Sequence, residues 1–142
     1  QSGFPLTLSM TNTLGIFNQR LRPDAVSGQS RATGTSNDDF NPNVDRRINL
    51  AAFATPAPYR MGTAPPTSQD LRTFPVLNED FSLIKETRIT ESVRLETYGQ
   101  FFNAFNRHRF HTFETNFSSN SFGFARGVSL PRFIQLGIRV RF

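Results

Sequence analysis

The last ten residues alternate between apolar and polar side chains, and this alternation constrains the fold more than any other feature of the chain. The polar positions include Arg139 and Arg141, and the apolar ones are Ile134, Leu136, Ile138, Val140 and Phe142. Because alternate side chains of a strand point to opposite faces, residues 133–142 are predicted to form a strand with one apolar and one charged face. Five apolar residues opposite two arginines are unusual at the edge of a soluble sandwich, but they suit a wall between lipid and a wet lumen.

Three other segments show the same period of two, which predicts strands at residues 3–11, 79–88 and 92–102. A tight turn at residues 89–92 joins the last two into a hairpin. The apolar face of these strands and of the final one is expected to contact lipid or a protein partner. The residues assigned to that face are Phe4, Leu6, Leu8, Phe81, Leu83, Val93, Leu95, Phe101, Ile134, Leu136 and Ile138.

The segments between these strands, residues 12–77 and 103–132, are rich in Pro, Gly, Asn and Ser and are predicted to be long surface loops. Loops of this length are improbable in a compact soluble domain. They suit a membrane barrel, which has short turns on one side and long loops on the other. Residues 1–142 are therefore interpreted as one all-β segment of antiparallel strands from a large outer-membrane β-barrel. The alternative is an open-edged β structure that is completed by strand pairing with other copies.

Composition excludes several other classes of protein. Only 37% of the residues are apolar, sixteen are Phe, and Trp and Cys are absent, so a large soluble core, a disulfide and a thiolate metal site are not expected. No apolar run approaches the length of a transmembrane helix. No leader is visible at Gln1, and an internal or processed start is expected. The net charge of +5 is dispersed along the chain, which suits anionic lipid headgroups as well as nucleic acid.

Metal sites have weak support in the sequence. His108 and His111 are the only histidines, would point to opposite faces of a strand, and lack a third zinc ligand. Residues 37–45 contain oxygen side chains at the spacing of a calcium loop, but Val44 replaces the required Gly and Leu50 the bidentate Glu. Asx turns are the favoured interpretation, and calcium binding is left open. No metal or cofactor is predicted.

Catalysis and nucleic-acid binding are not expected either. The paired carboxylates Asp38-Asp39 and Glu79-Asp80 have no neighbouring signal of the desolvated site that acid–base chemistry requires. The aromatic and basic stretch 101–113 lacks an RNA-binding consensus, and its Phe spacing is irregular. Its rings are interpreted as loop anchors and as an aromatic girdle at the membrane interface.

Four blocks resemble the C-terminal region of TonB-dependent outer-membrane receptors of the Oar-like type, which carry a carboxypeptidase-regulatory-like domain. The blocks are Ser2–Thr7, Asp80–Leu83 continuing to Glu91, Phe101–Asn106, and Pro131–Leu136. The resemblance implies a transporter of roughly 22 strands with a plug, of which this chain would supply about four strands and extracellular loops. It also implies a bacterial outer-membrane or cell-surface location, with an extracellular location as the alternative.

The final eight residues are similar to the signal read by the barrel-assembly machinery. That signal has a polar residue, a Gly, a hydrophobic residue and a terminal aromatic, and these places are filled by Gln135, Gly137, Val140 and Phe142. The implied partners are this machinery, outer-membrane lipid, and the remaining barrel strands or other copies of the chain. The alternative function is self-assembly through open strand edges into an extracellular fibre or other oligomer.

Overall fold

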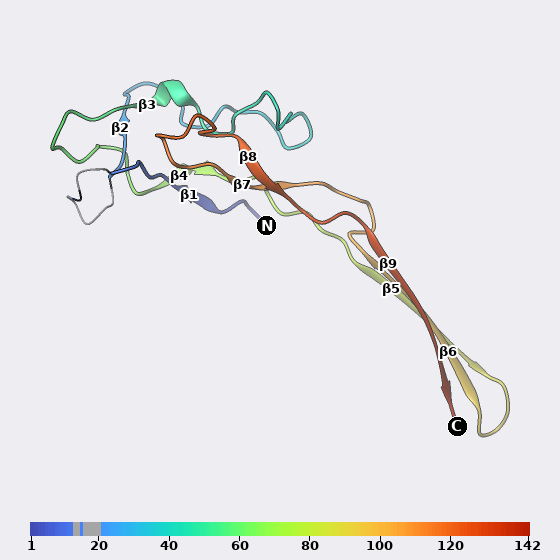
Figure 1. Ribbon diagram of the computed structural model, residues 1–142. Coiled ribbons are helices and arrows are strands. Elements are labelled where there is room, and N and C mark those ends of the chain that lie inside the picture. Colours follow the sequence, from blue (N-terminus) through green and yellow to red (C-terminus); the bar gives the residue numbers. More distant parts are fainter. Residues whose placement is uncertain (13–14, 16–20) are drawn as a thin grey trace. The chain divides into compact units, whose positions relative to one another are not determined.

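The computed structural model describes residues 1–12, 15 and 21–142, so part of the predicted loop 12–77 lies outside the described residues. The chain divides into two compact units, where the sequence predicted one segment. The aromatic-core unit comprises Gln1–Val76 and Arg109–Ser129, and the three-stranded unit comprises Leu77–His108 and Leu130–Phe142. Figure 1 labels the strands of each unit.

The three-stranded unit is an antiparallel meander of β5 (Phe81–Arg88), β6 (Arg94–Phe102) and β9 (Phe133–Arg141), in the order β5-β6-β9. Each strand begins and ends within two residues of a predicted range. The hairpin loop between β5 and β6 is closed by hydrogen bonds from the backbone N–H groups of Ile89 and Thr90 to the carbonyl of Val93, at 2.9 and 3.2 Å. Pairing with β6 is unbroken over the full length of β5, and β6 and β9 pair over the full length of both strands, without a bulge.

The aromatic-core unit contains three short antiparallel pairs. β1 (Pro5–Thr7) pairs with β4 (Thr67–Arg72), β2 (Asp24–Ala25) pairs with β3 (Phe53–Ala54), and β7 (Phe110–Phe113) pairs with β8 (Ala125–Val128). A 3-10 helix, η2 (Leu50–Ala52), precedes β3 and is capped by the Asn49 side chain, which accepts from the Ala51 N–H. No α-helix occurs in the part of the chain that the structure describes.

Aromatic packing organises this unit. Phe40, Phe74 and Phe113 contact one another with ring centroids 5.3 to 6.1 Å apart, and Phe53 and Phe122 contact at 5.9 Å. These edge-to-face contacts contribute beyond the area that they bury. The buried apolar residues of the core are Leu6, Leu8, Phe40, Ile48, Ala52, Phe53, Ala64, Leu71, Phe74, Phe113 and Phe122.

Two sequence predictions are corrected by this core. The segments 12–77 and 103–132 are not structureless over their described residues, because they contribute β2, β3, β4, β7, β8 and most of the buried rings. Leu6 and Leu8 do not face lipid or a partner, since they are 9% and 3% exposed inside the core. Phe4, from the same predicted face, is 56% exposed. The alternation did predict that Leu6 and Leu8 lie on one apolar face. That face, however, belongs to the core formed with Phe residues of distant segments.

Candidate membrane-facing sheet

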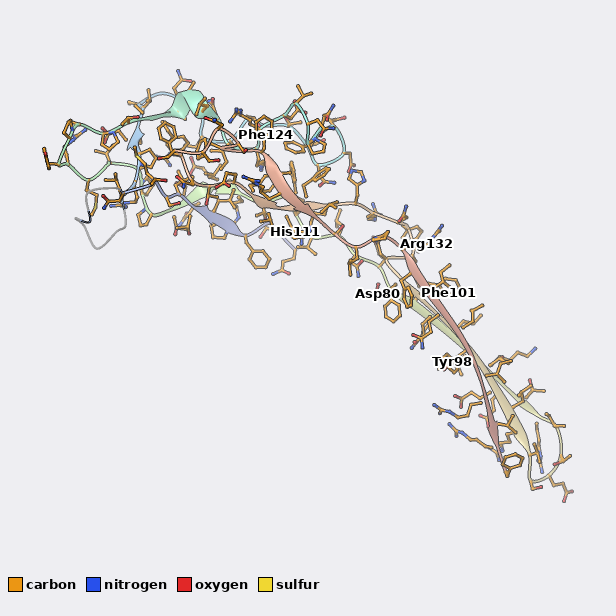
Figure 2. All side chains as sticks on the ribbon, viewed as in Figure 1. Asp80, Tyr98, Phe101, His111, Phe124 and Arg132 are labelled. Atoms are coloured by element: carbon orange, nitrogen blue, oxygen red, sulfur yellow. The ribbon has the colours of Figure 1, made fainter. Side chains whose placement is uncertain are left out.

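The register of β5, β6 and β9 sorts their side chains onto two chemically different faces, because directly opposite residues share a face. Phe81, Phe101 and Ile134 form one row across the three strands, and Leu83, Gly99 and Leu136 form the next. Two further rows complete this apolar face, namely Lys85, Thr97 and Ile138, then Thr87, Leu95 and Val140. Figure 2 shows side chains projecting from both faces of this sheet.

The apolar face is open to its surroundings. Leu136, Ile138 and Leu83 are 76%, 72% and 72% exposed. Exposed contiguous apolar surface of this kind marks a membrane or protein contact. Lys85 interrupts the apolar face in the second row from the hairpin loop. Its long apolar stem allows the ammonium group to reach a polar interface.

Strand length fits a bilayer crossing. The nine residues of β6 and the nine of β9 each extend about 30 Å at a rise of roughly 3.4 Å per residue. A strand that spans a membrane needs about 9–11 residues when tilted by roughly 45°. The apolar face is therefore long enough to cross the hydrocarbon layer.

The opposite, polar face is charged near the hairpin loop. Arg88, Arg94 and Arg141 lie directly opposite one another in the last row, and Glu86, Glu96 and Arg139 form the next row. The ion pairs join Arg94 to Glu86 at 3.2 Å, and Arg141 and Arg139 to Glu96 at 2.8 and 3.5 Å. Sequence inspection found Arg139 and Arg141 but missed the row of three arginines. The pairing of Arg88 with Arg94 follows a loop one residue longer than the predicted turn, and the place of Arg141 depends on the pairing of β9 with β6.

Farther along the polar face, Tyr98 lies across Gly137. A Cβ atom at Gly137 would overlap the Cζ and Oη atoms of Tyr98 and lie 2.6 Å from its Cε1. The two residues are directly paired between β6 and β9. The glycine thus leaves room for the ring on the neighbouring strand and ties the register of β9 to that of β6.

The four residues of the predicted assembly signal lie in or just beyond β9. Gln135 and Gly137 are on the polar face, and Val140 is on the apolar face with 45% exposure. Phe142 follows β9 and is 96% exposed. Val93 precedes β6 and is partly buried, as are Leu95 and Phe101 within the apolar face. β9 is an outer strand of the sheet, so one of its edges is unpaired within the described chain.

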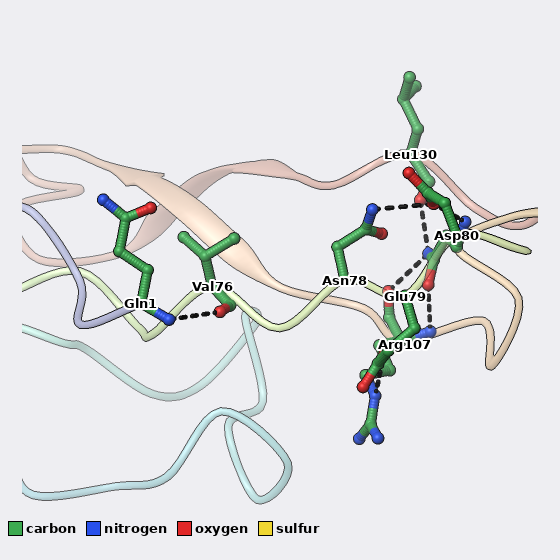
Figure 3. Close-up of polar contacts among 8 residues, drawn as sticks. Gln1, Val76, Asn78, Glu79, Asp80, Arg107 and Leu130 are labelled. Carbon is green, nitrogen blue, oxygen red and sulfur yellow. Dashed lines mark hydrogen bonds and ion pairs between the residues drawn. The ribbon is translucent and has the colours of Figure 1, made fainter.

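Asn103 terminates β6 at the end of the sheet away from the hairpin. It has a φ of 49° and is 8% exposed, and its backbone N–H donates to the Asp80 carboxylate at 2.8 Å. Its side-chain amide donates to the carbonyls of Arg107 and Leu130 at 2.8 and 3.0 Å, and its side-chain oxygen accepts from the Arg107 N–H at 2.8 Å. Arg107 also pairs with Glu79 at 2.9 Å (Figure 3). Asn103 thereby positions the chain leaving β6 and the chain entering β9.

The other predicted sites are separated or already hydrogen-bonded. The Asn41 side-chain oxygen accepts from the Asn43 N–H at 3.1 Å, as in an Asx turn, and an Asp45 carboxylate oxygen accepts from the Asn41 N–H at 2.8 Å. The Nδ1 atom of His111 hydrogen-bonds the Thr112 hydroxyl at 2.8 Å. Across residues 1–12, 15 and 21–142, no three His, Asp or Glu side chains gather as metal ligands.

Two side chains of the aromatic-core unit have shifted pKa values. Burial lowers the pKa of Arg47, whose guanidinium stacks 4.6 Å from the centre of the Phe74 ring. The hydrogen bond from the Asn116 N–H, 3.0 Å long, is the main cause that lowers the pKa of Glu114. Burial opposes this shift, and the Arg126 guanidinium at 2.9 Å reinforces it. Both groups hold loop segments of the core together.

The comparison with known families agrees with the two-faced sheet. A family model described as an outer membrane beta barrel domain matches residues 1–135. The chain belongs to this family. It is an outer-membrane β-barrel protein. The part of the chain that the structure describes is all-β, with antiparallel strands. No curated protein and no solved structure matches the chain. Among the described residues, no helix has the length and apolarity needed to cross a bilayer.

Proposed function

We propose that the chain is a C-terminal wall segment of a TonB-dependent outer-membrane transporter, in which β5, β6 and β9 cross the bilayer as consecutive strands. The observation that carries this proposal is the exposed apolar face opposite a charged face, on a sheet whose strands β6 and β9 have membrane-crossing length. In a barrel wall, the apolar face contacts lipid and the polar face lines the water-filled lumen. The role is to build a passage, and no catalytic step is assigned to it.

The connections suit this orientation. The hairpin loop after Arg88 is short, whereas the segments before β5 and after β6 contain the long stretches 12–77 and 103–132. Outer-membrane barrels have short periplasmic turns and longer extracellular loops. The hairpin loop is therefore assigned to the periplasm, and the long segments to the cell surface, where they would help to admit a ligand.

β9 is proposed to be the strand that the barrel-assembly machinery reads, through Gln135, Gly137, Val140 and Phe142. An outer strand with an unpaired edge can add to an edge of another sheet, with backbone hydrogen bonds for affinity and side chains for specificity. The same edge would later pair with another strand of the complete barrel wall, which removes the open edge.

A pair of single-tryptophan variants tests the membrane orientation. The chain has no Trp, so Leu136→Trp and Gln135→Trp each introduce one reporter, on adjacent residues of opposite faces. With the protein inserted in vesicles of brominated phosphatidylcholine, the indole of Leu136→Trp is expected to be strongly quenched, and that of Gln135→Trp weakly. Equal quenching of the two variants, or none in either, would contradict the proposal.

A second function is favoured by one observation. Both β5 and β9 have an unpaired edge in the described sheet, and open edges beside exposed apolar surface can pair between chains. In this alternative, copies assemble into an extracellular fibre or other oligomer. Electron microscopy of the protein without detergent separates the two, because regular fibres or rings support self-assembly. Order that appears only in detergent or lipid supports the membrane wall.

A further inference from the structure

The three arginines at the hairpin end of the polar face are the least compensated feature of the sheet. Arg88, Arg94 and Arg141 occupy directly opposite positions on three adjacent strands. Neighbouring strands lie about 4.8 Å apart, and like charges placed directly opposite destabilise a sheet. This row lies next to the hairpin loop, and the row beside it places Glu86 directly opposite Glu96.

The neighbouring glutamates offset the charge only in part. Glu86 pairs with Arg94, whereas Glu96 is shared between Arg141 and Arg139. Arg88 donates to the backbone carbonyls of Thr90 and Glu91, at 3.2 and 3.4 Å. Four guanidinium groups therefore face two carboxylates in these two rows, which leaves two positive charges. Arg94 and Arg141 remain 58% and 56% exposed in their side chains, so their unused N–H donors are accessible.

An apolar row adjoins these charges. Ile84 lies directly opposite Tyr98 on the polar face and is 64% exposed. It is four residues from Arg88 along β5, a separation of about 13 Å in a strand. A small inorganic anion would contact the arginines and leave Ile84 uncovered. An extended peptide with a carboxylate at one position and an apolar side chain four residues away would cover both.

We propose that this end of the polar face binds an extended acidic segment of a partner polypeptide, with Glu or Asp side chains on the arginine row and an apolar side chain on Ile84. The planar guanidinium forks suit bidentate contact with carboxylates, and the excess positive charge of the two rows complements the acidic segment. The inference rests on the proposed function only in assigning the polar face to an aqueous lumen.

The test is a binding assay on the full chain folded in a neutral detergent. The probe is a fluorescein-labelled peptide in which Val stands four residues after Glu, with Ser at the positions between, so that both side chains lie on one face of the extended chain. Fluorescence anisotropy gives its Kd. Arg94→Gln and Arg141→Gln are each expected to weaken binding about tenfold, because each removes charge-assisted hydrogen bonds. Arg94→Lys is expected to recover only part of the loss, because it keeps the charge but not the bidentate fork. Binding should weaken steeply with added salt.

The matched control is Arg132→Gln, which removes a guanidinium immediately before β9, at the opposite end of that strand from Arg141. It is expected to leave the Kd unchanged, and circular dichroism checks the folding of every variant. Equal loss in Arg132→Gln would overturn the proposal, as would equal binding of the matching Lys–Val peptide. Full displacement of the peptide by inorganic phosphate at the same concentration would also overturn it, because the site would then be one for simple anions.

The two proposals can fail separately. If Leu136→Trp is quenched by brominated lipid but no variant or wild-type chain binds the acidic peptide, the acidic partner is refuted and the membrane wall stands. If the peptide binds with the expected arginine dependence but neither tryptophan variant is quenched, the membrane wall is refuted. Both measurements are made on the same purified protein.

Discussion

Gly137→Ala is expected to destabilise the three-stranded sheet, although alanine normally stabilises a strand interior relative to glycine. The new methyl group would overlap the ring of Tyr98, so the ring must leave its place across β9. Gly99 provides the matched control within the same sheet. A Cβ there would meet the Leu136 Cδ2 and Phe101 Cε2 atoms at 3.3 and 3.4 Å, which small shifts of these side-chain atoms accommodate.

The size of the effect follows from two opposing contributions. Inserting a methyl group into an occupied position costs about 1–3 kcal/mol, whereas replacing Gly by Ala in a strand gains roughly 0.5–1 kcal/mol. Gly137→Ala should therefore lower the free energy of unfolding by about 1–2 kcal/mol, and Gly99→Ala should leave it nearly unchanged. In a Tyr98→Ala background, Gly137→Ala should become neutral or stabilising, which gives a coupling energy of about 2 kcal/mol in a double-mutant cycle.

The assay is urea unfolding in a neutral detergent, followed by circular dichroism for all four members of the cycle and for Gly99→Ala. Tyrosine fluorescence in a Tyr59→Phe background adds a local probe, since Tyr59 and Tyr98 are the only tyrosines. If Gly137→Ala costs the same with Tyr98 present and absent, or no more than Gly99→Ala, the packing of Tyr98 over Gly137 does not set the register.

Three further outcomes are expected. Asn103→Ala should lower the unfolding free energy of the sheet by about 2–4 kcal/mol, because it removes three side-chain hydrogen bonds and the tolerance of Asn for a positive φ. Asn103→Gly should lower it less, since Gly tolerates a positive φ. Equal losses in the two variants would contradict the role of the φ. Phe122→Ala should cost about 3–5 kcal/mol in denaturant unfolding of the aromatic-core unit, as a ring with 0% exposure is removed; a loss as small as that of the exposed Val44→Ala would contradict it. Because the folded pKa of Glu114 is lowered, the stabilisation by its ionised carboxylate should be complete above the unfolded pKa of about 4.3 and should disappear as pH falls through the folded pKa. The difference in unfolding free energy between wild type and Glu114→Gln, measured at several pH values, should shrink over the same range. A difference that does not depend on pH would refute this prediction.

The strands of the sheet could be located from the sequence because their period of two is strong and local. The alternation from Ile134 to Val140 requires two faces wherever that strand is placed, and the hairpin turn after Arg88 is set by the residues beside it. The same locality explains the error at Leu6 and Leu8. Alternation says that a face is apolar, but it does not say whether lipid or other side chains cover it.

The core of the aromatic unit could not be predicted from local patterns. Phe40, Phe74 and Phe113 are separated by more than thirty residues from one another in the sequence, yet their rings are in contact. The segments that carry them are rich in turn residues, so their local composition indicated loops. Arg47 stacks on Phe74 and donates to the carbonyls of Thr35 and Arg72, which helps such segments to pack without long strands.

The sequence alone therefore determines the alternation, the turn residues and the strand lengths, because each of these depends only on residues close to one another in the chain. The three-arginine row, the overlap of Tyr98 with the space above Gly137, and the meeting of distant Phe rings depend on which strands and loops become neighbours. Those neighbours are selected by the total free energy of packing and pairing across the fold, and a single segment carries only part of that information.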